Sequence, residues 1–91
     1  MNTRAGFATA LRSIRKKRNL TQEDFSDISS RTYLSSLERG IKSPTLEKID
    51  QLACALDVHP ITLLLFAYSS SEQCDLEDLY ARIKLDLKSL R

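Results

Sequence analysis

The sequence has few of the residues on which catalytic and metal sites depend. It contains two cysteines, Cys54 and Cys74, and one histidine, His59. The cysteines have neither C-x-x-C spacing nor histidine neighbours, so we expect reduced thiols and no metal site. His59 precedes Pro60 and belongs to no serine, cysteine or carboxylate constellation, so we expect it to start a helix. We therefore predict no enzyme activity, no bound metal and no cofactor.

Long hydrophobic runs are also absent. No apolar run approaches the ~20 residues that a membrane span needs. No apolar segment of the kind found in signal peptides follows the N-terminus. We therefore expect a cytoplasmic protein with no membrane contact. The 91 residues, 42% of them hydrophobic, suit one globular domain with a single small core and show no internal repeats.

The net charge is only +2, but it is unevenly distributed. Residues 1–48 hold ten Lys or Arg and five Asp or Glu, which gives +5. Residues 49–91 hold four and seven, which gives −3. This division is typical of a chain with a phosphate-facing half and a protein-facing half.

Apolar spacing predicts a first helix over residues 3–18, with Phe7, Leu11 and Ile14 on its inner side. Thr3 is its candidate N-cap, and Asn19 suits a left-handed turn after it. The basic run 15–18 closes this helix. Two roles stay open for the run: contact with phosphates, or a solvated helix end whose cations match the helix dipole.

The stretch 20–44 reads as two short helices joined at Ser29-Ser30. Thr21 caps the first helix, and a serine caps the second, which ends at Gly40 because glycine favours a left-handed C-cap. Leu34 and Leu37 point inward. The other face is small or cationic and carries no acid, which suits the major groove of DNA. It consists of Arg31, Thr32, Ser35, Ser36 and Arg39.

Three further segments follow. Thr45 caps a helix that runs to about residue 56, with a buried stripe of Leu46, Ile49, Leu52, Ala53 and Leu56. Asp57 is expected in a left-handed conformation, and Pro60 begins a helix over 60–68. Ser69 to Ser71 form a predicted linker, and the last helix covers 72–91.

The segments LTQEDF, RTYLSSLERG and KSPTLEKIDQLACAL, in this order, resemble phage repressor/Cro-like (XRE family) helix-turn-helix regulators. The resemblance covers about residues 7–64. It implies an all-α, five-helix lambda-repressor-like DNA-binding domain over 1–68, with a linker and an additional C-terminal helix over 69–91. The turn before the recognition helix is about two residues shorter than the family's and lacks its glycine. We therefore expect Ile28 to fill the apolar turn position and the second helix to end early.

The resemblance also implies roles for single residues. Arg31, Thr32, Ser35 and Ser36 are expected to contact bases, since the first turn of the recognition helix reaches base edges in this docking mode. Glu38 is expected to turn inward and pair with Arg15. The expected phosphate contacts are Gln22, which also braces the recognition helix, with Tyr33, Arg39, Lys42 and Ser43. For Tyr33 a second role stays open, that of covering the turn.

The C-terminal half carries more apolar residues than one small core needs. Eight of them are expected to form a dimer interface or to cover the core: Ile61, Leu65, Phe66, Leu76, Leu79, Tyr80, Ile83 and Leu87. The sequence therefore predicts a transcriptional regulator, a repressor that binds a palindromic operator in double-stranded DNA as a homodimer. The alternative is an antitoxin-like or adaptor module that binds a protein partner, with secondary DNA binding.

Overall fold

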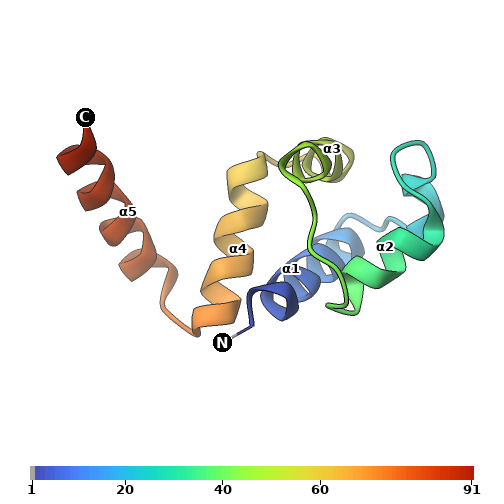
Figure 1. The fold of residues 1–91 in the computed structure, drawn as a ribbon, viewed down its shortest axis with the longest axis horizontal. Helices are drawn as coiled ribbons and strands as arrows, with labels where there is room; N and C mark the ends of the chain where they lie inside the picture. Colours follow the sequence, from blue (N-terminus) through green and yellow to red (C-terminus); the bar gives the residue numbers. More distant parts are fainter. Residues whose placement is uncertain (1) are drawn as a thin grey trace.

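The computed structural model describes residues 2–91, and throughout these residues the fold is all-α (Figure 1). The elements are α1 (Thr3–Lys17), a 3-10 turn η1 (Gln22–Phe25), α2 (Arg31–Glu38), α3 (Leu46–Leu56), α4 (Pro60–Glu72) and α5 (Leu76–Leu90). Helix α1 packs against both α2 and α4, while α5 extends beyond α4 at the far end. The second expected helix is thus a single 3-10 turn, which ends early as the shortened junction predicts.

Side chains of polar residues cap most of the helices. Thr45 accepts from the Lys48 amide at 3.1 Å, as predicted. For α1 the prediction was wrong, because Asn2 is the cap and Thr3 is the first helical residue. The Asn2 Oδ1 accepts from the amides of Arg4 and Ala5 at 3.0 and 3.3 Å, which satisfies two of the free donors of the first turn.

Left-handed residues mark several of the helix ends. Asn19 and Asp57 have φ of 58° and 59°, and Gly40 has φ of 72°, as the sequence predicts. Gln73 also has a positive φ, of 53°, and it ends α4. Because glutamine is not a residue type that favours this conformation, the local sequence does not predict it.

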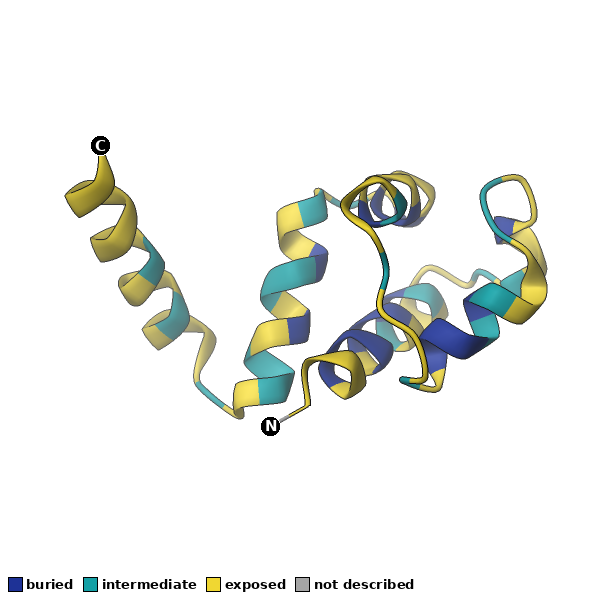
Figure 2. Cartoon of the chain, in the orientation of Figure 1, coloured by how far each residue is buried: buried dark blue, intermediate teal, exposed yellow. Residues whose placement is uncertain are grey.

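The core lies among α1, α2, α3 and the inner side of α4 (Figure 2). Its largest fully buried side chains are Leu11, Phe25, Leu34, Leu37, Leu52, Leu56 and Leu63. Ile28 packs against this cluster from the turn, as expected. Leu46, predicted to be buried, is 76% exposed. It is the first residue of α3, and the buried stripe of that helix starts at Ile49.

Helices α1 and α4 cross very closely at Gly6. A Cβ on Gly6 would lie 2.4 Å from the Ala67 carbonyl oxygen and 2.6 Å from the Ser71 Cβ. Because Ser71 takes part in this crossing, the prediction of a linker over Ser69–Ser71 was wrong. The serines continue α4 to Glu72, so the expected boundary between residues 68 and 69 falls inside a helix.

Helices α3 and α4 meet at a sharp bend of 102°. The His59 Nδ1 accepts from the Ile61 amide at 3.0 Å, and Pro60 occupies the first helical position, as predicted. Among residues 2–91 no single helix is long and apolar enough to cross a membrane. Helices α3 and α4 meet that criterion only when they are taken together across the bend.

Candidate nucleic-acid interface

Helix α2 begins and ends at well-formed caps. The Ser30 Oγ accepts from the Tyr33 amide at 3.1 Å at the start of the helix. At its end, Ile41 N–H donates to the Ser36 carbonyl and Gly40 N–H to the Leu37 carbonyl. This pair of bonds is a Schellman motif, and the positive φ of Gly40 makes it possible. The helix is therefore fixed at both ends before any ligand binds.

The outer face of α2 is open to solvent. Arg31, Thr32 and Arg39 are exposed and Ser35 is half-buried. Together with Gln22 from η1, these residues line a shallow hollow of about 300 Å³. Because the lining has donors and small side chains but no carboxylate, it can approach base edges and phosphates without charge repulsion.

Ser36 does not belong to this outer face. It is 7% exposed, and its Oγ donates to the Thr32 carbonyl at 3.0 Å. The expectation that Ser36 contacts bases was therefore wrong. A small polar side chain has no strong preference for either side of a helix, and here the register of Leu34 and Leu37 places it inside.

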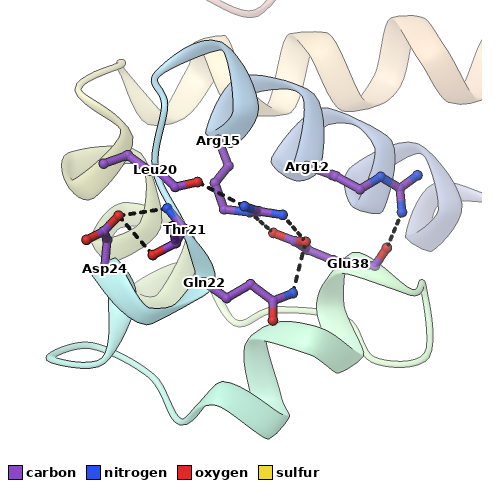
Figure 3. A network of polar contacts seen from close by, with 7 residues as sticks. All are labelled: Arg12, Arg15, Leu20, Thr21, Gln22, Asp24 and Glu38. Carbon is purple, nitrogen blue, oxygen red and sulfur yellow. Dashed lines mark hydrogen bonds and ion pairs between the residues drawn. The ribbon is translucent and has the colours of Figure 1, made fainter.

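Glu38 is buried and forms an ion pair with the largely buried side chain of Arg15 behind the recognition helix (Figure 3). The Arg15 Nε and Nη2 donate to the two carboxylate oxygens of Glu38 at 2.6 and 2.9 Å. Hydrogen bonding to Glu38 raises the pKa of Arg15 above its ordinary value, and burial opposes this increase. The pairing that the resemblance implies is therefore present, with Glu38 turned inward and 4% exposed.

Gln22 completes the network around this carboxylate. Its Nε2 donates to the Glu38 Oε1 at 3.2 Å, while the Arg15 Nη1 donates to the Leu20 carbonyl at 2.9 Å (Figure 3). The buried carboxylate thus links α1, the segment before η1, η1 itself and α2. Gln22 braces the recognition helix in this way, and its predicted phosphate contact stays a prediction.

The turn before η1 is held by a short local network. Asp24 accepts from both the amide and the hydroxyl of Thr21, at 2.7 and 3.1 Å (Figure 3). Thr21 is the N-cap of η1, as predicted, and it forms a capping box with Asp24. The side chain of Asp24 is therefore directed to its own turn.

Several cations bind carbonyl groups at the ends of neighbouring helices. Arg12 donates to the Glu38 carbonyl at 3.1 Å, and Arg4 donates to the Ile41 carbonyl at 3.2 Å. Arg18 donates to the carbonyls of Leu56 and Asp57 at the end of α3. These bonds place positive charge at the negative ends of α2 and α3.

Of the basic run 15–18, Arg15 is half-buried and the other three residues are exposed. The side chains of Arg15 and Arg18 nevertheless both bind partners within the fold. Sequence reasoning missed Arg12, although its spacing of three from Arg15 places both on one side of α1. That spacing was the signal that could have found it.

Tyr33 lies half-buried against the core cluster, on the side of α2 nearest the following loop. The ammonium groups of Lys42 and Lys48 each lie 5.7 Å from the centre of its ring. Lys48 also donates to the Ile28 carbonyl in the shortened turn. Lys48 thus connects the ring to the turn. Both roles of Tyr33, covering the turn and contacting a phosphate, stay predictions.

The loop after α2 exposes Lys42 and Ser43 beside the end of the recognition helix. The eight residues of the predicted dimer interface lie elsewhere, on α4 and α5. Leu65, Leu79 and Ile83 are half-buried, and the other five are 38–52% exposed. The structure therefore separates the polar face of α2 from the apolar surface of α4 and α5.

Comparison with known proteins agrees with this geometry. A family model described as helix-turn-helix matches residues 11–63, more than half of the chain. The chain is 40% identical over 68 residues to the control protein C.BamHI of Bacillus amyloliquefaciens. This alignment covers 71% of this chain and 84% of that protein. It is 43% identical over 53 residues to y4dJ, an uncharacterized HTH-type transcriptional regulator of Sinorhizobium fredii (strain NBRC 101917 / NGR234). This alignment covers 56% of this chain and 69% of y4dJ.

A solved structure is also similar over nearly the whole length. The clp gene regulator ClgR from Corynebacterium glutamicum matches with a TM-score of 0.71 and 30% identity, covering 92% of this chain and 93% of that chain. The match therefore extends beyond the residues of the family model. The chain belongs to the XRE family of helix-turn-helix proteins and is a DNA-binding transcriptional regulator.

Proposed function

We propose that this protein represses transcription by binding a palindromic operator as a homodimer. The observation that carries the proposal is the acid-free outer face of α2, held from behind by the buried Glu38 network. Because the only carboxylate of the helix is turned inward and paired, the face can enter the major groove without repelling phosphates. A protein bound in this way represses when its operator overlaps a promoter.

Two kinds of DNA contact are assigned to separate residues. Arg31 and Thr32, in the first turn of α2, read base edges, with Ser35 one turn further along. Arginine can pair with guanine O6 and N7, and the threonine methyl can contact a thymine methyl. Gln22, Arg39, Lys42 and Ser43 contact the sugar-phosphate backbone. Backbone contacts position the domain, and base contacts select the sequence.

The apolar surface of α4 and α5 supports the homodimer. Burial of an apolar side chain contributes about 1.5–3 kcal/mol, so several exposed residues of this kind favour association. Ile61, Phe66, Leu76, Tyr80 and Leu87 are all at least 38% exposed in the single chain. One helix-turn-helix module buries limited DNA surface, and pairing doubles its contacts.

Gel-shift titration on genomic fragments tests the proposal, with sedimentation to measure the oligomeric state. We expect the full chain to be a dimer that shifts a subset of fragments. A variant truncated after Gln73, which removes α5 and leaves α4 whole, should sediment as a monomer with much weaker binding. Its helix content by circular dichroism, matched to α1–α4, is the folding control. A dimeric protein that shifts no fragment would instead support the protein-interaction module.

A further inference from the structure

A hollow of about 260 Å³ lies between α4 and α5. Thr62, Leu65, Phe66 and Ser69 line it from α4, and Leu76 and Tyr80 line it from α5. No residue of α5 is fully buried, and its half-buried positions are Leu79 and Ile83. The two helices therefore form the sides of an apolar groove that the single chain leaves open.

We infer that this groove receives α5 of a second copy, so that the two α5 helices pair antiparallel. The inference rests on the proposed homodimer and specifies how it forms. By twofold symmetry each α5 enters the groove of the other chain. The four helices then lie in the order α4, partner α5, α5, partner α4, and the apolar sides of both grooves are covered.

The charge of α5 favours the antiparallel direction. Residues 75–82 carry three acids and one arginine, a net −2, while residues 83–91 carry three cations and one acid, a net +2. A parallel pair would place like charges together along the whole helix. An antiparallel pair places each acidic half against the basic half of the partner, and it also opposes the helix dipoles favourably.

The spacing of the apolar residues sets the register. Leu76, Tyr80, Ile83, Leu87 and Leu90 recur at four, three, four and three residues, which is the seam of a helix pair. With the twofold axis between Ala81 and Arg82, Leu76 lies opposite the partner copy of Leu87, and Tyr80 lies opposite the partner copy of Ile83. The flanking position Glu77 then lies near the partner copy of Lys84. Both residues are exposed in the single chain, and by symmetry their ion pair forms twice.

The dimensions of the molecule agree with entry into the groove. Helices α2 and α5 lie at opposite ends of the chain, whose longest dimension is 41 Å (Figure 1). A contact on the outer side of α5 would separate the two recognition helices by far more than the ~34 Å of one DNA turn. Because the partner α5 enters between α4 and α5, the twofold axis moves inward and this separation shortens.

Disulfide trapping tests the register directly. In a background with Cys54→Ser and Cys74→Ser, Leu76→Cys and Leu87→Cys proteins are purified separately and then mixed to exchange subunits. We expect a disulfide-linked dimer only in the mixture, since a disulfide requires Cα atoms about 4.4–6.8 Å apart. Leu85→Cys, at a 66% exposed position off the seam, is the matched control and should not cross-link.

Charge reversal provides a test that leaves the apolar seam intact. Glu77→Lys and Lys84→Glu each bring like charges together at both symmetry-related contacts. An exposed ion pair changes an equilibrium constant by a factor of up to about five. Each variant should therefore weaken dimerisation roughly tenfold, as measured by sedimentation. The double variant restores opposite charges and should return to near the original affinity. A parallel pair brings these two positions into no contact, so the double variant would then show no recovery.

The outcomes separate this inference from the proposed function. Cross-linking of Leu76→Cys with itself, or a dimer that shows neither trapping nor charge recovery, overturns the antiparallel pairing and leaves operator binding by a dimer intact. A full chain that stays monomeric, both free and on DNA, overturns the homodimer and the pairing together.

Discussion

Arg15 binds both carboxylate oxygens of Glu38, at 2.6 and 2.9 Å, and so joins α1 to the last turn of the recognition helix. The pair lies behind α2, while Arg31, Thr32 and Arg39 lie exposed on its other side. Stability and sequence reading are therefore assigned to opposite faces of one eight-residue helix. Substitutions on the two faces should accordingly have different effects.

Glu38→Ala should lower the stability of the fold by about 3–5 kcal/mol, because it leaves the largely buried Arg15 charge without its partner. Thermal or denaturant unfolding measures this change. Glu23→Ala, an exposed carboxylate on η1, is the matched control and should have little effect. A Glu38→Ala protein with unchanged stability but altered sequence preference would show that the carboxylate acts at the DNA.

Arg31→Ala should relax base preference at one position in each half-site and cost about 1–3 kcal/mol for the preferred base. The reason is its exposed position in the first turn of α2. Competition binding with operators substituted at single positions measures the change. Arg82→Ala, on α5, should keep the original preference. An unchanged motif in Arg31→Ala would remove this residue from the base contacts.

Arg39→Ala and Lys42→Ala should weaken binding to all sequences alike. Each should reduce the slope of log K against log salt by about one unit for each phosphate that the side chain no longer neutralises. A titration series between about 50 and 200 mM salt measures the slope. If it does not change, these two side chains do not neutralise phosphates.

Ser36→Ala should leave base preference unchanged, in contrast to Ser35→Ala. Ser36 is buried and its hydroxyl is bonded to the Thr32 carbonyl, so only a small decrease in stability, of order 1 kcal/mol, is expected. Parallel selection experiments on the two variants make the comparison. A shift in the motif with Ser36→Ala alone would mean that α2 presents a different face to the DNA.

Gly6→Ala should destabilise the fold by about 1–3 kcal/mol, since the added methyl group would meet the Ala67 carbonyl oxygen and Ser71. The same change raises helix propensity, so a gain in stability would be expected if α1 and α4 were further apart. Thr9→Ala, an exposed position on α1, is the control. Unfolding experiments decide the sign of the effect.

Much of the fold could be predicted from local chemistry. Caps such as Thr45, and left-handed residues such as Asn19 and Asp57, are set by their own side chains and neighbours. The apolar spacing of Leu34 and Leu37 identifies the inner side of α2. These features depend on a few consecutive residues, and the structure contains them as expected.

The errors concern residues whose environment is set by distant segments. Ser36 is buried because of the way α2 as a whole is seated, and Leu46 is exposed because α3 approaches the core only from Ile49 onward. The serines 69–71 are helical because α4 crosses α1 at Gly6. In each case the single residue is compatible with both outcomes, and tertiary packing decides between them.

Selection of bound DNA from a random pool is the decisive experiment for operator recognition by α2. We expect enrichment of an inverted repeat whose half-sites are centred about 34–36 Å apart, one turn of DNA or a multiple of it. A guanine contacted by Arg31 should recur in each half-site, and its enrichment should disappear with Arg31→Ala. A pool in which no sequence is enriched over the input, although the protein is folded and dimeric, would contradict operator recognition by the outer face of α2.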